Sequence, residues 1–159
     1  DVAPSRGLGD VYKRQLEDLT GIENFPNLKT LTLGYCTNME KLDISGLHQV
    51  EKVSGSSLNN CEEYNLGDNP ITEFDGAGYY GYSERNSLKI ISTKLETSNL
   101  SLYSWYASYD EVTSIDVSEC PALTTLNVKR SDKLKTLYLK KGQEIPNLTK
   151  DAATEIVYK

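Results

Sequence analysis

Apolar residues recur along this chain singly and at a regular interval, in the pattern apolar-x-x-apolar-x-apolar. The segment 28–36, LKTLTLGYC, shows the pattern clearly, and the segment 39–47, MEKLDISGL, repeats it eleven residues later. Units of this kind are predicted to begin at positions 16, 28, 39, 50, 61, 71, 88, 100, 112, 123 and 134. A period maintained over this many units indicates a stack of similar structural units.

The spacing within each unit predicts a short strand. Two apolar residues that are two positions apart point to the same face of a strand, and the residue three positions earlier enters the core from the preceding turn. An eleven-residue unit is too short for a strand plus a helix, so two units make one coil of about 22 residues. One coil buries too few side chains to be stable alone, and stacking completes its core and its backbone hydrogen bonds.

One long step, from 71 to 88, predicts an insertion at about 76–87, GAGYYGYSERNS. After it, LKIIST is expected to bury Leu88 and Ile91, and NLSLYSW to bury Leu100, Tyr103 and Trp105. The residues that follow predicted strands include Cys36, Asn69 and Cys120. Buried side chains there are expected to satisfy the backbone of each turn.

Residues 1–15 are expected to be foreign to the repeat. The segment 5–15, SRGLGDVYKRQ, resembles the translation of an adapter used in transposase-based sequencing libraries. We therefore predict a metagenomic fragment whose native sequence begins near Leu16, preceded by a non-native, disordered segment. A secretion signal would then lie upstream, and the short Gly7-Leu8-Gly9 stretch is not a phosphate-binding loop.

The repeat also resembles a known family. The segment 114–143, SIDVSECPALTTLNVKRSDKLKTLYLKKGQ, is similar to bacterial surface leucine-rich-repeat proteins of the Bacteroides type, and 42–47 and 69–75 echo the same unit. The resemblance spans about 16–159 and implies a β-rich leucine-rich-repeat solenoid of about five 22-residue coils, with short parallel strands, little helix and a C-terminal cap at about 140–159. It further implies an extracellular or cell-surface location and a role in binding.

Composition narrows the functional classes. The net charge of −6 offers no basic face to nucleic acid, and no apolar run is long enough to span a membrane. The three cysteines match no zinc motif and are predicted to be buried apolar residues, while His48 is predicted to lie on the surface. With one histidine the chain presents no catalytic triad, and the acidic residues around Asn69 and Asp75 match no calcium motif. We therefore expect no enzyme activity, no cofactor and no metal.

Aromatic residues gather in and after the predicted insertion. Tyrosine and tryptophan combine apolar area with a polar tip, which suits recognition of proteins and sugars. Tyr103 and Trp105 fall on core positions of the repeat, so the candidate ligand-binding residues are Tyr79, Tyr80, Tyr82, Tyr106 and Tyr109.

The sequence thus leads to one function and leaves two alternatives open. The leading hypothesis is a non-catalytic binding module that contacts a protein or another host ligand. The first alternative is a structural spacer or C-terminal cap of a longer solenoid. The second is carbohydrate binding through the 79–109 aromatic cluster.

Overall fold

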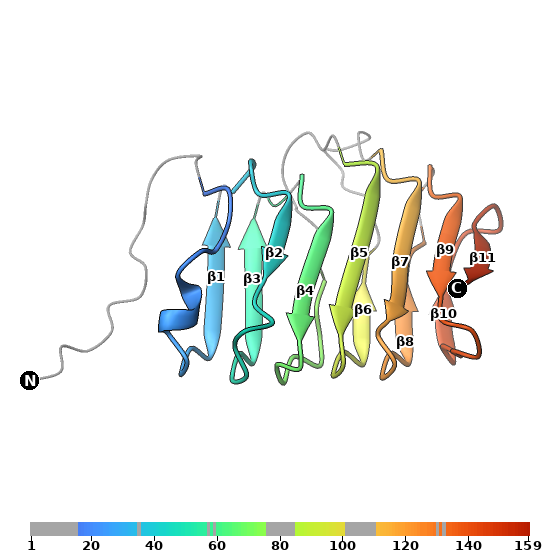
Figure 1. Cartoon of the computed structure of the whole chain (residues 1–159). Helices are drawn as coiled ribbons and strands as arrows, with labels where there is room; N and C mark the ends of the chain where they lie inside the picture. The colour runs from blue at the N-terminus through green and yellow to red at the C-terminus, as the bar shows by residue number, and fades with distance from the viewer. Residues whose placement is uncertain are drawn as a thin grey trace, which may run out of the picture.

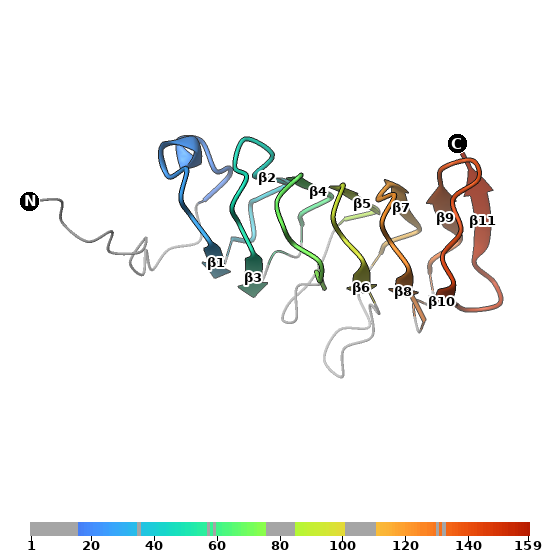
Figure 2. The same ribbon diagram turned by 90° about the horizontal axis from the view of Figure 1, so that it is seen from below.

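The computed structural model describes residues 16–34, 36–56, 58, 60–75, 85–100, 111–129, 131 and 133–159. In these residues the chain winds into a stack of coils whose strands lie on two opposite faces (Figures 1 and 2). The predicted solenoid of about five coils of about 22 residues, with parallel strands and almost no helix, is confirmed. Residues 1–15, predicted to be disordered, lie outside the described part of the chain.

The described residues contain one short 3-10 helix, η1 (Ile22–Asn24), and otherwise strands and turns. The strands are β1 (Thr30–Gly34), β2 (Lys41–Asp43), β3 (Lys52–Ser56), β4 (Glu63–Gly67), β5 (Ser87–Ser92), β6 (Thr97–Asn99), β7 (Ser114–Glu119), β8 (Thr125–Asn127), β9 (Thr136–Leu139), β10 (Asn147–Thr149) and β11 (Glu155–Tyr158). No helix in this described part is long and apolar enough to cross a membrane.

The strands alternate between the two faces as the chain proceeds, except that β4 and β5 follow each other on one face, with the isolated bridge at Glu73 between them on the other. One face is a six-stranded parallel sheet in the order β11-β9-β7-β5-β4-β2, called here the six-stranded face. The opposite face, called the narrow face, holds the pair β1-β3 and the sheet β10-β8-β6. An isolated parallel bridge joins Glu73, in the coil before β6, to Thr97 of β6. Two sequence units therefore make one coil, one unit on each face.

Equivalent core residues line up from coil to coil. Leu88 of β5 is in register with Ile115 of β7, which is in register with Leu137 of β9. All three side chains are buried, and they belong to one continuous core that extends from Leu31 to Ile145. The alternation of apolar and polar residues in each strand produces this arrangement, because successive side chains point to opposite sides of a sheet.

The phase of the repeat differs from the prediction in the middle of the chain. Leu88 and Ile90 occupy the buried positions of β5, while Ile91, expected in the core, is only half-buried on the outer surface. The unit therefore begins at Arg85, which is 3% exposed and donates a hydrogen bond from Nη1 to the carbonyl of Cys61 at 3.4 Å. A buried arginine at a template position concealed the true start of the unit.

The next unit also begins earlier in the sequence than predicted. It begins at Leu95, five residues before the predicted start at Leu100, and places Ser98 in the core with its hydroxyl donating to the carbonyl of Phe74. The chain therefore carries extra residues in two consecutive coils, between 75 and 85 and between 100 and 112, and not in one insertion. Tyr103 and Trp105, expected in the core, lie outside the described residues.

A buried amide supports the turns, as expected for Asn69. Its Nδ2 donates to the carbonyls of Ile44 and Leu66, both at 2.9 Å, and its Oδ1 accepts from the backbone N–H of Val50 at 3.0 Å. Three coils on, Gln143 donates from Nε2 to two carbonyls of the preceding coil and accepts from the N–H of Lys140. Each side chain thus joins two neighbouring coils. It gives a partner to one backbone N–H and a second donor to carbonyls that also accept from backbone N–H groups.

Candidate functional site

The connections along one edge of the solenoid differ greatly in length. This edge, called the long-loop edge, is defined by the described residues where the chain leaves the narrow face and enters the six-stranded face. These residues bound the segments 35–40, 57–62, 75–86, 100–113, 128–135 and 150–154. The third and fourth segments are much the longest, and they belong to neighbouring coils. Function in repeat proteins concentrates on such extended connections, because a rigid scaffold holds them in place.

The two long segments share neighbouring anchor points at both of their ends. Where they leave the narrow face, the N–H of Asn99 donates to Oδ1 of Asp75 at 3.2 Å. Where they enter the six-stranded face, the N–H and hydroxyl of Thr113 donate to the carbonyl of Asn86 at 2.9 and 3.2 Å. The scaffold therefore holds both ends of one segment directly beside the ends of the other.

The five tyrosines predicted to bind a ligand fall between these anchors in the sequence. Tyr79, Tyr80 and Tyr82 belong to the first long segment, and Tyr106 and Tyr109 belong to the second. All five lie outside the described residues. The structure shows that the anchor points of the two segments are adjacent, which the predicted starts of the repeat units did not reveal.

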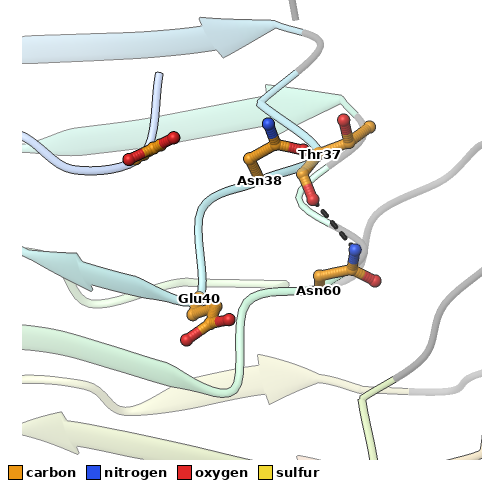
Figure 3. Close-up of a pocket in the computed structure, with 5 residues that line it drawn as sticks. Thr37, Asn38, Glu40 and Asn60 are labelled. Atoms are coloured by element: carbon orange, nitrogen blue, oxygen red, sulfur yellow. Dashed lines mark hydrogen bonds between the residues drawn. The ribbon is translucent and has the colours of Figure 1, made fainter. Parts of the chain in front are cut away.

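A hollow of about 480 Å³ opens on the same edge, nearer to the N-terminal end (Figure 3). It is lined by Glu17, Thr37, Asn38, Glu40 and Asn60. The Nδ2 of Asn60 donates to the carbonyl of Thr37 at 2.9 Å, and this bond ties two neighbouring turns together along the rim. The lining is polar and partly acidic, so an apolar ligand would gain little by entering it.

The outer surface of the six-stranded face is charged, and its charges alternate. Across four strands the row in register reads Lys41, Glu63, Lys89 and Asp116. The Nζ of Lys41 lies 2.9 Å from the carboxylate of Glu63, and the Nζ of Lys89 lies 2.6 Å from that of Glu119. Carboxylates of the same sheet thus neutralise the lysines of this row, which leaves them less available to an external ligand.

Two carboxylates of this face are also held by serines two residues later. Asp43 accepts from the N–H and hydroxyl of Ser45, and Asp116 accepts from the N–H and hydroxyl of Ser118, at 2.6 to 3.0 Å. Burial alone would raise the pKa of Asp116, but the hydrogen bonds from Lys159 and Ser118 outweigh it and lower that pKa below its ordinary value. These aspartates are structural anchors held in their charged form.

The narrow face carries mainly uncharged polar side chains. Its outward rows include Thr30, Thr32, Ser54, Thr97, Asn99, Thr125, Asn127, Asn147 and Thr149. Some of them bond across coils, as Thr32 does with Ser54 at 3.2 Å and Asn147 with Thr125 at 3.3 Å. The two faces therefore differ in chemistry, although they are built from the same repeat.

Among the described residues, the cysteine and histidine side chains have structural surroundings. Cys36, Cys61 and Cys120 are free and buried, as predicted, and burial raises the pKa of Cys61 to about 11 and that of Cys120 to about 12. His48 is exposed, as predicted, with its Nδ1 2.7 Å from Oδ1 of Asp68. Within the part of the chain that the structure describes, no group of three His, Cys, Asp or Glu side chains is arranged to hold a metal ion.

Comparison with known proteins adds no relative: no family model, no curated protein and no solved structure matches this chain.

Proposed function

We propose that this chain is a non-catalytic binding module of a leucine-rich-repeat protein that is secreted or displayed on a cell surface, and that it recognises a protein ligand through the long-loop edge. One observation carries the proposal. The two longest connections of the chain, rich in tyrosine by sequence, are anchored side by side through Asp75 with Asn99 and through Asn86 with Thr113. A rigid scaffold with adjacent variable loops is a common design of binding proteins.

The charge distribution supports the choice of this edge over the six-stranded face. There, lysines and carboxylates pair with each other, and a ligand would have to break these pairs before forming its own. Tyrosine side chains are uncharged and offer both apolar area and a hydroxyl. Leucine-rich-repeat identity and the cell-surface location rest on the resemblance of 114–143 to the bacterial surface family.

The test is a binding screen of the purified chain against arrays of extracellular matrix proteins, host cell-surface proteins and glycans. For any ligand found, Tyr80→Ala and Tyr106→Ala are expected to weaken binding by about tenfold or more, because aromatic anchors dominate recognition surfaces. Tyr138→Ala, on the six-stranded face, is the matched control and is expected to leave binding unchanged. Loss of binding with Tyr138→Ala alone would contradict the proposed edge.

The spacer alternative is favoured by a different observation, the continuity of the scaffold. Parallel pairing extends along the six-stranded face from β2 to β11, which suits a rigid element that holds two other parts of a protein apart. A spacer would bind nothing on any of the arrays. Binding to glycans alone, lost with Tyr80→Ala or Tyr106→Ala, would instead support carbohydrate recognition.

A further inference from the structure

The C-terminal end of the described solenoid presents an exposed strand edge. β11 is the outermost strand of the six-stranded face and pairs only with β9 among the described strands (Figures 1 and 2). Val157 and Tyr158 are 40% and 58% exposed, which places half of the four large exposed apolar side chains of the described residues on this one strand. An edge of this kind is a template for pairing with another strand.

The backbone of β11 shows which groups face outward. The N–H of Glu155 donates to Lys135 and the N–H of Lys159 donates to Leu139, so these residues point their backbone groups towards the β9 side. Backbone groups alternate sides along a strand, and those of Ile156 and Tyr158 therefore point to the open edge. A new strand would form its hydrogen bonds with these two residues.

The sequence of the edge is its own complement in the antiparallel direction. When EIVYK (155–159) is placed against a second copy with Val157 opposite Val157, Glu155 meets Lys159 of the second copy and Ile156 meets its Tyr158. Ile156 and Tyr158 then form hydrogen-bonded pairs in both directions, and the central valines form a non-hydrogen-bonded pair. Opposite charges and apolar pairs placed across strands both stabilise a sheet.

We propose that two copies of this chain associate through antiparallel pairing of β11, which gives a two-fold dimer with one continuous sheet. Both sides of the strand gain from the contact. On the outer side, the two Val157 side chains cover each other, and Glu155 of the second copy adds a carboxylate beside Lys159, whose ammonium group pairs with Asp116 of its own chain. On the inner side, Ile156 and Leu148, which are half-buried against the end of the core, gain neighbours from the second copy.

The first experiment is an oxidative cross-link in the full chain. Paired residues at a non-hydrogen-bonded position have Cα atoms about 4.5 Å apart, which is within reach of a disulfide. Val157→Cys is therefore expected to give a covalent dimer under mild oxidation, and the buried native cysteines should not compete. Ser114→Cys, an outward position in the middle of the same face, is the control and should remain monomeric on a denaturing gel.

The second experiment measures association directly by analytical ultracentrifugation. The chain is expected to show a monomer–dimer equilibrium, and Val157→Asp, which places like charges opposite each other, is expected to weaken it about tenfold or more. Glu155→Lys and Lys159→Glu should each weaken the dimer, while an equal mixture of the two restores it, because both ion pairs then re-form. A monomer at all concentrations, an open-ended series of oligomers, or a mixture that fails to dimerise would each overturn the proposal.

Discussion

The Nζ of Lys159 lies 2.6 Å from Oδ2 of Asp116, which is 43 residues earlier in the chain and two strands away in the sheet. The same ammonium group lies 4.1 Å from the centre of the Tyr138 ring, on the strand between them. The backbone of Lys159 also bonds to both Leu139 and Lys141. One residue thus fastens the last strand to two earlier coils.

The ion pair with Asp116 is therefore expected to stabilise the C-terminal coil. Lys159→Met keeps the aliphatic stem but removes the charge, and it should lower the free energy of unfolding by about 1 kcal/mol, since the lysine is half-exposed. Urea denaturation of the variant against the parent, both in the Val157→Asp background to suppress association, measures the difference. Lys29→Met, which removes a pair exposed on both sides, should change stability much less.

The same pair should make stability depend on acid. The pKa of Asp116 is lower in the folded chain than its ordinary value of 3.8, so the folded state favours the charged form. The stabilisation is complete above that ordinary value and is lost as the pH falls through the lowered pKa. The difference in unfolding free energy between Lys159→Met and the parent should accordingly shrink as the pH is lowered below 3.8. A difference that is constant with pH would contradict this assignment.

Asn69 is expected to be among the most sensitive polar positions. Asn69→Ala leaves the buried N–H of Val50 without its partner and removes the second donor to the carbonyls of Ile44 and Leu66, which should cost about 1–3 kcal/mol. Thermal or urea unfolding reports the loss. Gln143→Ala removes a similar set of bonds where the side chain is only half-buried, so water can replace them and the loss should be smaller.

Two glycines offer a matched test of backbone strain and close packing. Gly67 and Gly142 both have positive φ values, of 60° and 81°. A Cβ at Gly142 would meet nothing within 4 Å, but one at Gly67 would lie 2.9 Å from Cα of Ser45 in the preceding coil. Gly142→Ala should therefore cost about 1 kcal/mol for the backbone alone, and Gly67→Ala about 2–4 kcal/mol. Equal losses would show that the coils can separate at Ser45 without penalty.

The thiols should report opening of the core. Cys61 and Cys120 are fully buried, and their pKa values are raised to about 11 and 12. Near neutral pH neither thiol is accessible to a reagent, and very little of either is ionised. Labelling with a thiol reagent at about pH 8 is expected to be slow in the native chain and complete after unfolding in urea. Rapid labelling of Cys120 in the native chain would indicate that the core opens at its centre.

The fold could be predicted from sequence because its signal is repeated many times. Units such as 39–47 and 123–128 keep apolar residues at every template position, and there the predicted core residues are buried. The phase was wrong where polar residues occupy the core. Arg85 and Ser98 are buried at template positions, while the apolar Ile91 faces outward, so a pattern of apolar residues selected the wrong unit starts.

The candidate site was harder to predict for a related reason. Sequence identified the tyrosines but placed the extra length in one insertion, and therefore could not show that two long segments are anchored side by side. That relationship depends on the pairing of Asp75 with Asn99 and of Asn86 with Thr113, which are 24 and 27 residues apart. No local pattern of residues encodes such a distance.

The direction of the bonds between coils has a mechanical consequence. Strands lie across the long axis of the stack, so the hydrogen bonds that join neighbouring coils run along that axis (Figure 1). A force that pulls the described ends of the stack apart would break the bonds of one coil after another, and not those of all coils at once. The chain should then yield at low force in discrete steps, each releasing one coil of about 22 residues, or about 7 nm of extended chain.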